Sequence, residues 1–163
     1  MRYFAAKTLT AIKTILTNQF NNMIDTLRTK YADSTIPYAN LITTGGLEAN
    51  LAMPQIKISF VKEELIEDEM LEDYAENMNT IYRFLVMAAL ESNVSTLQAH
   101  CCYYIEALQR IFHGYGGVTQ SDVNKIDANI TWIRCKGGEL GSITDSNENE
   151  IYKAIAVELE VRV

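Results

Sequence analysis

Apolar and polar side chains alternate along the last stretch of the chain, from residue 151 to residue 163. The apolar side chains that share one side are Ile151, Ile155, Val157, Leu159, Val161 and Val163, with Lys153, Glu158, Glu160 and Arg162 among their neighbours. This alternation predicts a half-buried strand. Because a strand needs partners for its backbone groups, it either pairs at the centre of a sheet or is offered to another molecule. The pattern favours assembly over catalysis.

Two other stretches have a helical period. Between residues 4 and 31, apolar side chains recur every three or four positions without Gly or Pro, which predicts a long amphipathic helix. A second apolar stripe of the same period runs from Thr96 to Phe112, after Ser95, whose side chain is suited to cap a helix. Gly114, Gly116 and Gly117 are expected to end this second helix.

The remaining apolar runs predict two hairpins. Residues 56–61 alternate, and residues 80–90 are β-branched and aromatic before they become continuously apolar, so we expect these two strands to pair antiparallel. Residues 128–135 are expected to pair with the terminal strand. We also consider a short strand near residues 38–43. The order helix, strand, strand, helix, strand, strand predicts an α+β fold with a mainly antiparallel sheet.

Composition agrees with one folded domain over residues 1–163, since 48% of the residues are hydrophobic and 21% are charged. The net charge of −7 and the pI near 4.8 disfavour a partner whose many phosphates must be neutralised by clustered Lys and Arg. Neither an uninterrupted signal-peptide core nor an apolar run long enough for a membrane span is present in the sequence. We therefore expect a cytosolic protein without a membrane partner.

The connection at residues 63–76 holds eight carboxylates and no basic residue. A calcium loop needs carboxylates at alternating positions and a glycine at the turn, and this segment has neither. We expect instead a negatively charged projection towards a partner or a lumen. Its central residues are Glu67, Asp68, Glu69, Glu72 and Asp73.

Residues that could carry chemistry are poorly placed for it. His100, Cys101, Cys102 and His113 form no pair with metal-ligand spacing, and adjacent cysteines on a helix point about 100° apart. Cys135, like the other two cysteines, lies in an apolar segment, which favours a reduced thiol over a disulfide or a nucleophile. We therefore expect no enzyme activity, no metal and no cofactor.

The order of these elements resembles the tail terminator (tail completion) proteins of long-tailed bacteriophages and phage-tail-like particles. The resemblance depends on the long N-terminal helix and on four further segments. These are the I-x-I-x-F strand from Ile56 to Phe60 that runs into the acidic loop, the strand from Tyr82 to Leu90, the helix from Tyr104 to Phe112, and the last strand from Tyr152 to Val161 after Gly141-Ser142.

This resemblance implies a structural virion protein that forms a ring, usually a hexamer, on the end of the tail tube. The implied partners are further copies of itself, the tail tube protein, a head-tail connector or neck protein and, in some particles, a sheath protein. DNA would only pass through the lumen, where acidic protomers avoid phosphate contacts. The implied location is the virion tail or neck, with the host cytoplasm during assembly.

A closed ring needs a heterologous interface, and exposed hairpins or edge strands are suited to form one. We expect this interface on the first hairpin and the terminal strand. The candidate residues are Ile56, Ile58, Phe60, Ile155, Val157, Leu159 and Val161.

Three alternatives remain open. A head completion or connector protein would have a similar size and would also oligomerise. A small-ligand or enzyme module would use a pocket between the long helix and the sheet, with His100 or His113 as acid-base group. A regulatory protein would use the acidic 63–76 segment to mimic nucleic acid or to dock on a basic surface.

Overall fold

Helices and strands of the computed structural model follow one another in separate runs along the chain, as in an α+β fold, which confirms the predicted class. The structure describes residues 4–46, 52–66, 79–91, 96–113, 130, 132–144 and 150–162. Its elements are α1 (Phe4–Tyr31), β1 (Leu41–Thr44), β2 (Gln55–Ile66), β3 (Asn79–Glu91), α2 (Leu97–His113), β4 (Trp132–Thr144) and β5 (Glu150–Arg162). Both helices agree with the periodic segments that predicted them.

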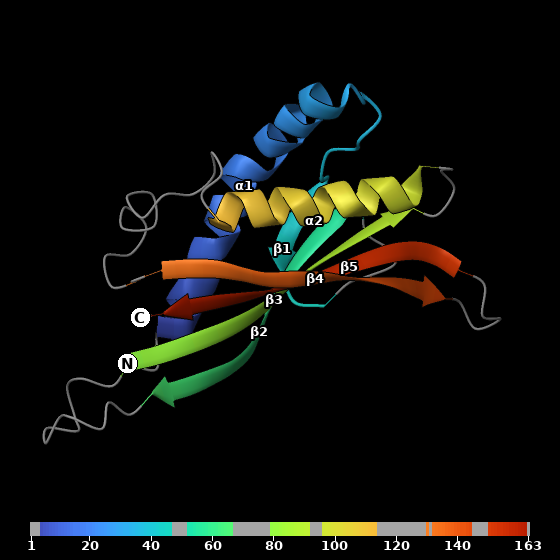
Figure 1. Ribbon diagram of the computed structural model, residues 1–163. Helices are drawn as coiled ribbons and strands as arrows, with labels where there is room; N and C mark the ends of the chain where they lie inside the picture. Colours follow the sequence, from blue (N-terminus) through green and yellow to red (C-terminus); the bar gives the residue numbers. More distant parts are fainter. Residues whose placement is uncertain are drawn as a thin grey trace, which may run out of the picture.

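The five strands form one mixed sheet in the order β1-β2-β3-β5-β4 (Figure 1). The expected antiparallel pairs β2 with β3 and β4 with β5 are present, but the arrangement of two hairpins is only approximate. β1 is a fifth strand, which overlaps the short strand considered near residues 38–43, and it runs parallel to the first part of β2. β1 has four residues, which is too short for its alternation to stand out in the sequence.

The last strand, β5, pairs on both sides within the chain. Its Val157 lies opposite Val86 of β3 and opposite Gly138 of β4. The sequence left two possibilities for this strand, pairing at the centre of a sheet or pairing with another molecule. In the structure it lies at the centre of the sheet. Its backbone is already paired along both edges and is not available to a neighbouring molecule.

Two strands are longer than the sequence predicted. β2 continues past residue 61 into the acidic segment, where Glu63 lies opposite Tyr82. β4 continues past Cys135. Its register with β5 shifts between Cys135 and Gly138, and the pairing with β5 then continues from Gly138 onward. Gly137 has a φ of 101° in this irregularity, a conformation that favours glycine. Glu63 and Glu64, at the start of the expected acidic connection, and the largely polar residues 137–144 therefore belong to strands.

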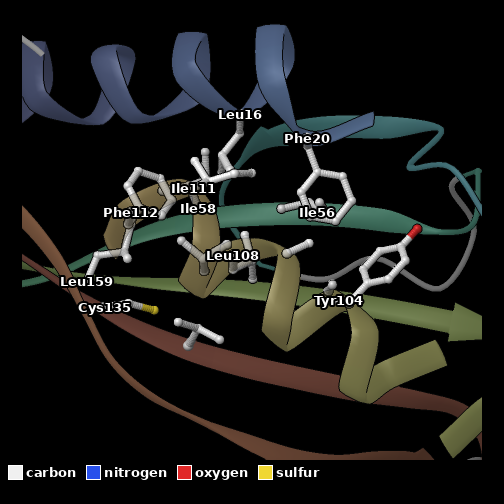
Figure 2. Packing of buried hydrophobic residues seen from close by; sticks show 14 of the residues in the cluster. Leu16, Phe20, Ile56, Ile58, Tyr104, Leu108, Ile111, Phe112, Cys135 and Leu159 are labelled. Atoms are coloured by element: carbon white, nitrogen blue, oxygen red, sulfur yellow. The ribbon is translucent and has the colours of Figure 1, made fainter. Parts of the chain in front are cut away.

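The core lies between the two helices and one face of the sheet. Alternate residues of β2, β3 and β5 are fully buried on this face, together with one stripe from each helix. Figure 2 shows Leu16 and Phe20 of α1 approaching Ile56 and Ile58 of β2, with Leu108 of α2 beside them. α1 contacts β1 and β2, whereas α2 contacts β3, β4 and β5. The opposite face of the sheet is thus turned away from both helices.

The end of α1 is fastened to the chain that follows it. Ala32 adopts a positive φ of 51°, and the backbone N–H of Asp33 donates to the carbonyl of Arg28 at 3.1 Å. The Arg28 guanidinium then donates to the carbonyl of Ile36 through Nε and Nη2, at 2.8 and 2.6 Å. These bonds direct the chain from the end of α1 back towards β1.

Candidate assembly surface

Seven charged side chains form a network on the face of the sheet turned away from the helices. They alternate with core residues along β2, β3, β4 and β5, so the strand period places them together. We refer to this set as the ion-pair cluster: Lys62, Glu64, Arg83, Arg134, Lys136, Glu158 and Glu160.

Glu160 is the centre of the ion-pair cluster. Its side chain is only 2% exposed and accepts from three cations on neighbouring strands. Oε1 lies 2.7 Å from Arg83 Nη1 and 2.8 Å from Lys136 Nζ, and Oε2 lies 2.8 Å from Arg134 Nη2. A buried carboxylate with this many partners ties β5 to the strands on both sides of it.

Electrostatics keep Glu160 charged. Burial alone would raise the pKa of its carboxyl, but hydrogen bonds from Lys136 and Arg134 and the charge of Arg83 lower this pKa below its usual range. Arg83 extends the network in the other direction, because it also pairs with Glu158 and, at 2.9 Å, with Glu64 of β2. All four cations of the cluster have a carboxylate partner, so the cluster itself offers no unpaired cation to phosphate.

Large apolar side chains are exposed on β2 and on β4, the two outer strands of the antiparallel part of the sheet. Phe60 is 45% exposed and Val61 is 52% exposed, at the point of β2 where its register with β3 shifts. Leu140 on β4 is 42% exposed. Phe60 also packs edge-on against Phe84, with ring centroids 5.7 Å apart. These three residues lie on the two strands that border the antiparallel part of the sheet.

Most of the side chains expected at a subunit interface lie in the core instead. Six of the seven candidates are fully buried within the chain, because their face of the sheet is covered by α1 and α2. They are Ile56, Ile58, Ile155, Val157, Leu159 and Val161, with exposures of 0–1%. Alternation identified the buried face correctly, but the partner on that face is the chain's own helices. Only Phe60 remains accessible.

The expected acidic projection, with Glu67, Asp68, Glu69, Glu72 and Asp73, lies outside the described residues. The two carboxylates that precede it, Glu63 and Glu64, belong to β2. Hydrogen bonds from Lys62 and Arg83 lower the pKa of Glu64.

His100 lies beside a small pocket rather than in a catalytic arrangement. Its side chain is buried, with Nε2 3.2 Å from Thr35 Oγ1 and 3.8 Å from Asp33 Oδ2. Burial lowers the pKa of the imidazole, although Asp33 opposes this effect. The adjacent pocket of about 110 Å³ is lined by Pro37, Met53, Pro54, Leu90, Glu91, Leu97 and His100. Typical small-molecule pockets have about 300–1,000 Å³. The side chain of His113 lies outside the described part of the chain.

The cysteines have no disulfide partner among the described residues. Cys101 and Cys135 are buried and Cys102 is exposed. Burial raises the pKa of the Cys135 thiol to about 11, which leaves it protonated and unreactive at neutral pH. Within the described ranges, no three His, Cys, Asp or Glu side chains are grouped as metal ligands. No helix in the same ranges is long and apolar enough to cross a membrane.

Sequence reasoning did not find the ion-pair cluster, although one signal was present. Arg83 is the only charged residue within the apolar run from 80 to 90, and a lone charge in a buried strand needs a partner. Alternation also places Glu158 and Glu160 together on the polar side of β5. What the sequence does not contain is the strand order that brings Arg83 and Arg134 to either side of Glu160.

Comparison of the sequence with models of known protein families and with curated proteins finds no match.

Proposed function

We propose that this protein is a tail terminator, a structural subunit that forms a ring on the end of a phage tail tube. In this role it ends polymerisation of the tube and presents a docking surface to the head connector. Its partners are other copies of itself, the tail tube protein and a connector or neck protein. The role requires complementary surfaces and no catalytic residue.

The observation that supports this proposal most is the arrangement of the elements. The resemblance to tail terminators depends on a long N-terminal helix, a strand pair, a second helix and a second strand pair. α1, β2 with β3, α2, and β4 with β5 follow one another in this order and share one core. The sheet and the two helices pack around this core and form a single folded subunit.

Charge supports the same role in a second way. A ring around passing DNA needs to avoid many unpaired cations, because each phosphate contact releases counterions and holds the DNA. The chain has a net charge of −7, and the four cations of the ion-pair cluster are neutralised by carboxylates of the same sheet.

The first experiment is the native mass of the purified protein by light scattering, with negative-stain images of the same sample. We expect a closed ring of about six protomers of 18.4 kDa each. The second experiment adds the protein to growing tail tubes and measures their length distribution. Addition is expected to stop growth, with a ring visible at tube ends. Uninhibited growth and bare tube ends would contradict the proposal.

A pull-down separates the terminator from a head completion protein. Immobilised tail-tube ends and immobilised portal complexes are offered in parallel to the same protein. Retention on tube ends supports the terminator, whereas retention on portal complexes alone would assign the protein to the connector. The His100→Ala variant serves as a control, because the proposed function uses no acid-base group and retention should stay unchanged.

A further inference from the structure

The pocket beside His100 lies where α2 begins and β3 ends, and it has a volume of about 110 Å³. The polar members of its wall are His100 and Glu91. The rest of the wall is apolar and comes from separate parts of the chain: Pro37, Met53, Pro54, Leu90 and Leu97. Leu90, Leu97 and His100 are buried, whereas Glu91 is exposed. The pocket therefore reaches from the surface to the edge of the core.

The wall of this pocket is held by hydrogen bonds of its own. The Tyr104 hydroxyl donates to the carbonyl of Pro37 at 2.9 Å, and the backbone N–H of Asn40 donates to the carbonyl of Pro54 at 2.8 Å. Leu90 belongs to β3, which lies between β2 and β5 in the sheet. A pocket whose walls are already in place needs little ordering when a ligand enters, and this favours binding.

The direction of one hydrogen bond determines which nitrogen of His100 carries its hydrogen. The hydroxyl of Thr35 donates to Oδ1 of Asp33 at 2.5 Å, so its single hydrogen is already used. Oγ1 of Thr35 lies 3.2 Å from Nε2 of His100 and therefore accepts a hydrogen bond from this nitrogen. Burial lowers the pKa of the imidazole, which favours the neutral ring. A neutral ring with its hydrogen on Nε2 has a lone pair on Nδ1.

This Nδ1 is an acceptor without a partner among the described residues. The polar contacts of the ring within those residues, to Thr35 and Asp33, both involve Nε2. Neither Thr35 nor Asp33 lines the pocket, so the pocket borders another side of the ring. The His100 side chain is only 4% exposed. A buried acceptor in this position is stabilised when a ligand donates a hydrogen bond to it.

The size of the pocket fits one small ring. A closed apolar cavity of about 150 Å³ holds benzene, and this pocket of about 110 Å³ has in addition an exposed residue, Glu91, at its edge. Nucleotides and larger cofactors need pockets of about 300 Å³ or more. The thioether of Met53 is suited to contact an aromatic ring. Nδ1 of His100 selects a ring that carries an O–H or N–H donor.

We propose that the pocket at the start of α2 binds a small aromatic ring, such as a phenol, that donates one hydrogen bond to Nδ1 of His100. The ring comes either from a free small molecule or from a tyrosine side chain of another protein. The site shares no residue with the ion-pair cluster. The inference goes beyond the proposed function and does not depend on it.

Nuclear magnetic resonance of the imidazole tests this site. The chain has two histidines, so every protein in the experiment carries His113→Gln and shows one histidine ring. Phenol, anisole and toluene are titrated at about pH 8, where an ordinary imidazole is neutral. We expect phenol to shift the His100 ring signals and to saturate in the millimolar range. Anisole and toluene donate no hydrogen bond and should bind about fivefold more weakly.

Two variants assign this preference to Nδ1, with binding measured from the methyl signals of Leu90 and Leu97. His100→Phe keeps a ring in the wall but has no acceptor, so phenol should lose its advantage over toluene. Thr35→Val removes the acceptor that holds the hydrogen on Nε2, so the advantage of phenol over anisole should decrease. Thr17→Val is the matched control, because the Thr17 hydroxyl is exposed and donates to a carbonyl of α1. It should leave the advantage unchanged.

Three results would overturn the inference. Phenol would leave the His100 signals unchanged, anisole would bind as tightly as phenol, or His100→Phe would keep the preference for phenol. Far-ultraviolet circular dichroism shows whether each variant is folded. The comparison of phenol with anisole uses an unaltered pocket, so it is decisive for any behaviour of the His100→Phe chain.

The two sources of the ring are separated by p-cresol and N-acetyltyrosinamide, which carry the same phenol. Binding of both compounds assigns the pocket to a tyrosine of a partner protein. Binding of p-cresol alone assigns it to a free small molecule, because the backbone around a tyrosine is then excluded. Ring assembly and tube binding are measured independently, so a failure of the proposed function would not be mistaken for a failure of this site.

Discussion

Glu160 and Arg83 each have three oppositely charged partners in the ion-pair cluster, and Glu160 is the more buried of the two. Replacing it by glutamine leaves Arg83, Arg134 and Lys136 close together without their common carboxylate. Breaking a buried pair costs about 3–5 kcal/mol, and the partial exposure of Arg134 and Lys136 reduces this to about 2–3 kcal/mol. We expect Glu160→Gln to lower the free energy of unfolding by this amount in urea denaturation.

Glu158→Gln is the matched control. Glu158 contacts the same arginine, but its side chain is 40% exposed, so its loss should cost less than about 1 kcal/mol. Equal effects of the two substitutions would show that burial at Glu160 does not matter.

Glu106 predicts a dependence of stability on pH. Burial alone would raise the pKa of this carboxyl, but hydrogen bonds from Lys30, Tyr31 and Arg110 lower it to about 2. A carboxyl whose pKa is lower in the folded chain adds stability above its unfolded pKa, about 4.3, and loses it as pH falls towards the folded value. We expect the urea midpoint to fall between about pH 5 and pH 2, and less steeply in Glu106→Gln.

At the scale of single elements, the close approach of α2 to β4 depends on Gly138. A Cβ at this position would lie 2.7 Å from Cγ2 of Ile105. Gly138→Ala therefore forces the Ile105 side chain or the helix to move, at about 1–3 kcal/mol. Thermal denaturation should show this loss, and the double variant with Ile105→Ala should recover part of it. Gly141→Ala is the control, because its nearest neighbour would be a carbonyl at 4.0 Å.

At the end of α1, a substitution is expected to raise the free energy of unfolding. Ala32 has a left-handed φ of 51°, which costs a non-glycine residue about 1–2 kcal/mol. Glycine removes this cost but loses about 0.4–1 kcal/mol through a freer unfolded chain. We expect Ala32→Gly to raise the free energy of unfolding by about 0.5–1 kcal/mol in urea. Ala99→Gly, at an exposed position in α2, should lower it by about 1 kcal/mol.

The elements also show which parts of the fold were predictable from sequence. α1, α2 and the alternating stretch of β5 have long, regular patterns, because one face of each is buried and the other is not. β1 and the second half of β4 have no such pattern. β1 is short, and residues 136–142 of β4 are all exposed, so burial leaves no alternation in them. The interface prediction was wrong for Ile56 and Val157 because a buried face does not reveal what buries it.

For the whole molecule, the net charge of −7 predicts weak interaction with nucleic acid. Affinity for DNA depends mainly on the number of phosphates that cations neutralise, and the cations of the ion-pair cluster already have partners. We expect no retention of duplex DNA in a filter-binding assay at about 50 mM salt, where such contacts are strongest. Retention that disappears between about 50 and 200 mM salt would contradict this expectation and favour a nucleic-acid-binding role.

The central position of β5 also determines the order in which the protein can fold during its synthesis. β3 leaves the ribosome before α2 and β4, yet its second neighbour in the sheet is β5, which follows them. Until β5 has emerged, β3 and β4 have no common partner, and the backbone edges with which they will pair to β5 stay unpaired. Pairing across the middle of the sheet is therefore completed last. A chain that stalls on the ribosome before β5 would expose unpaired strand edges, which favour aggregation unless a chaperone binds them.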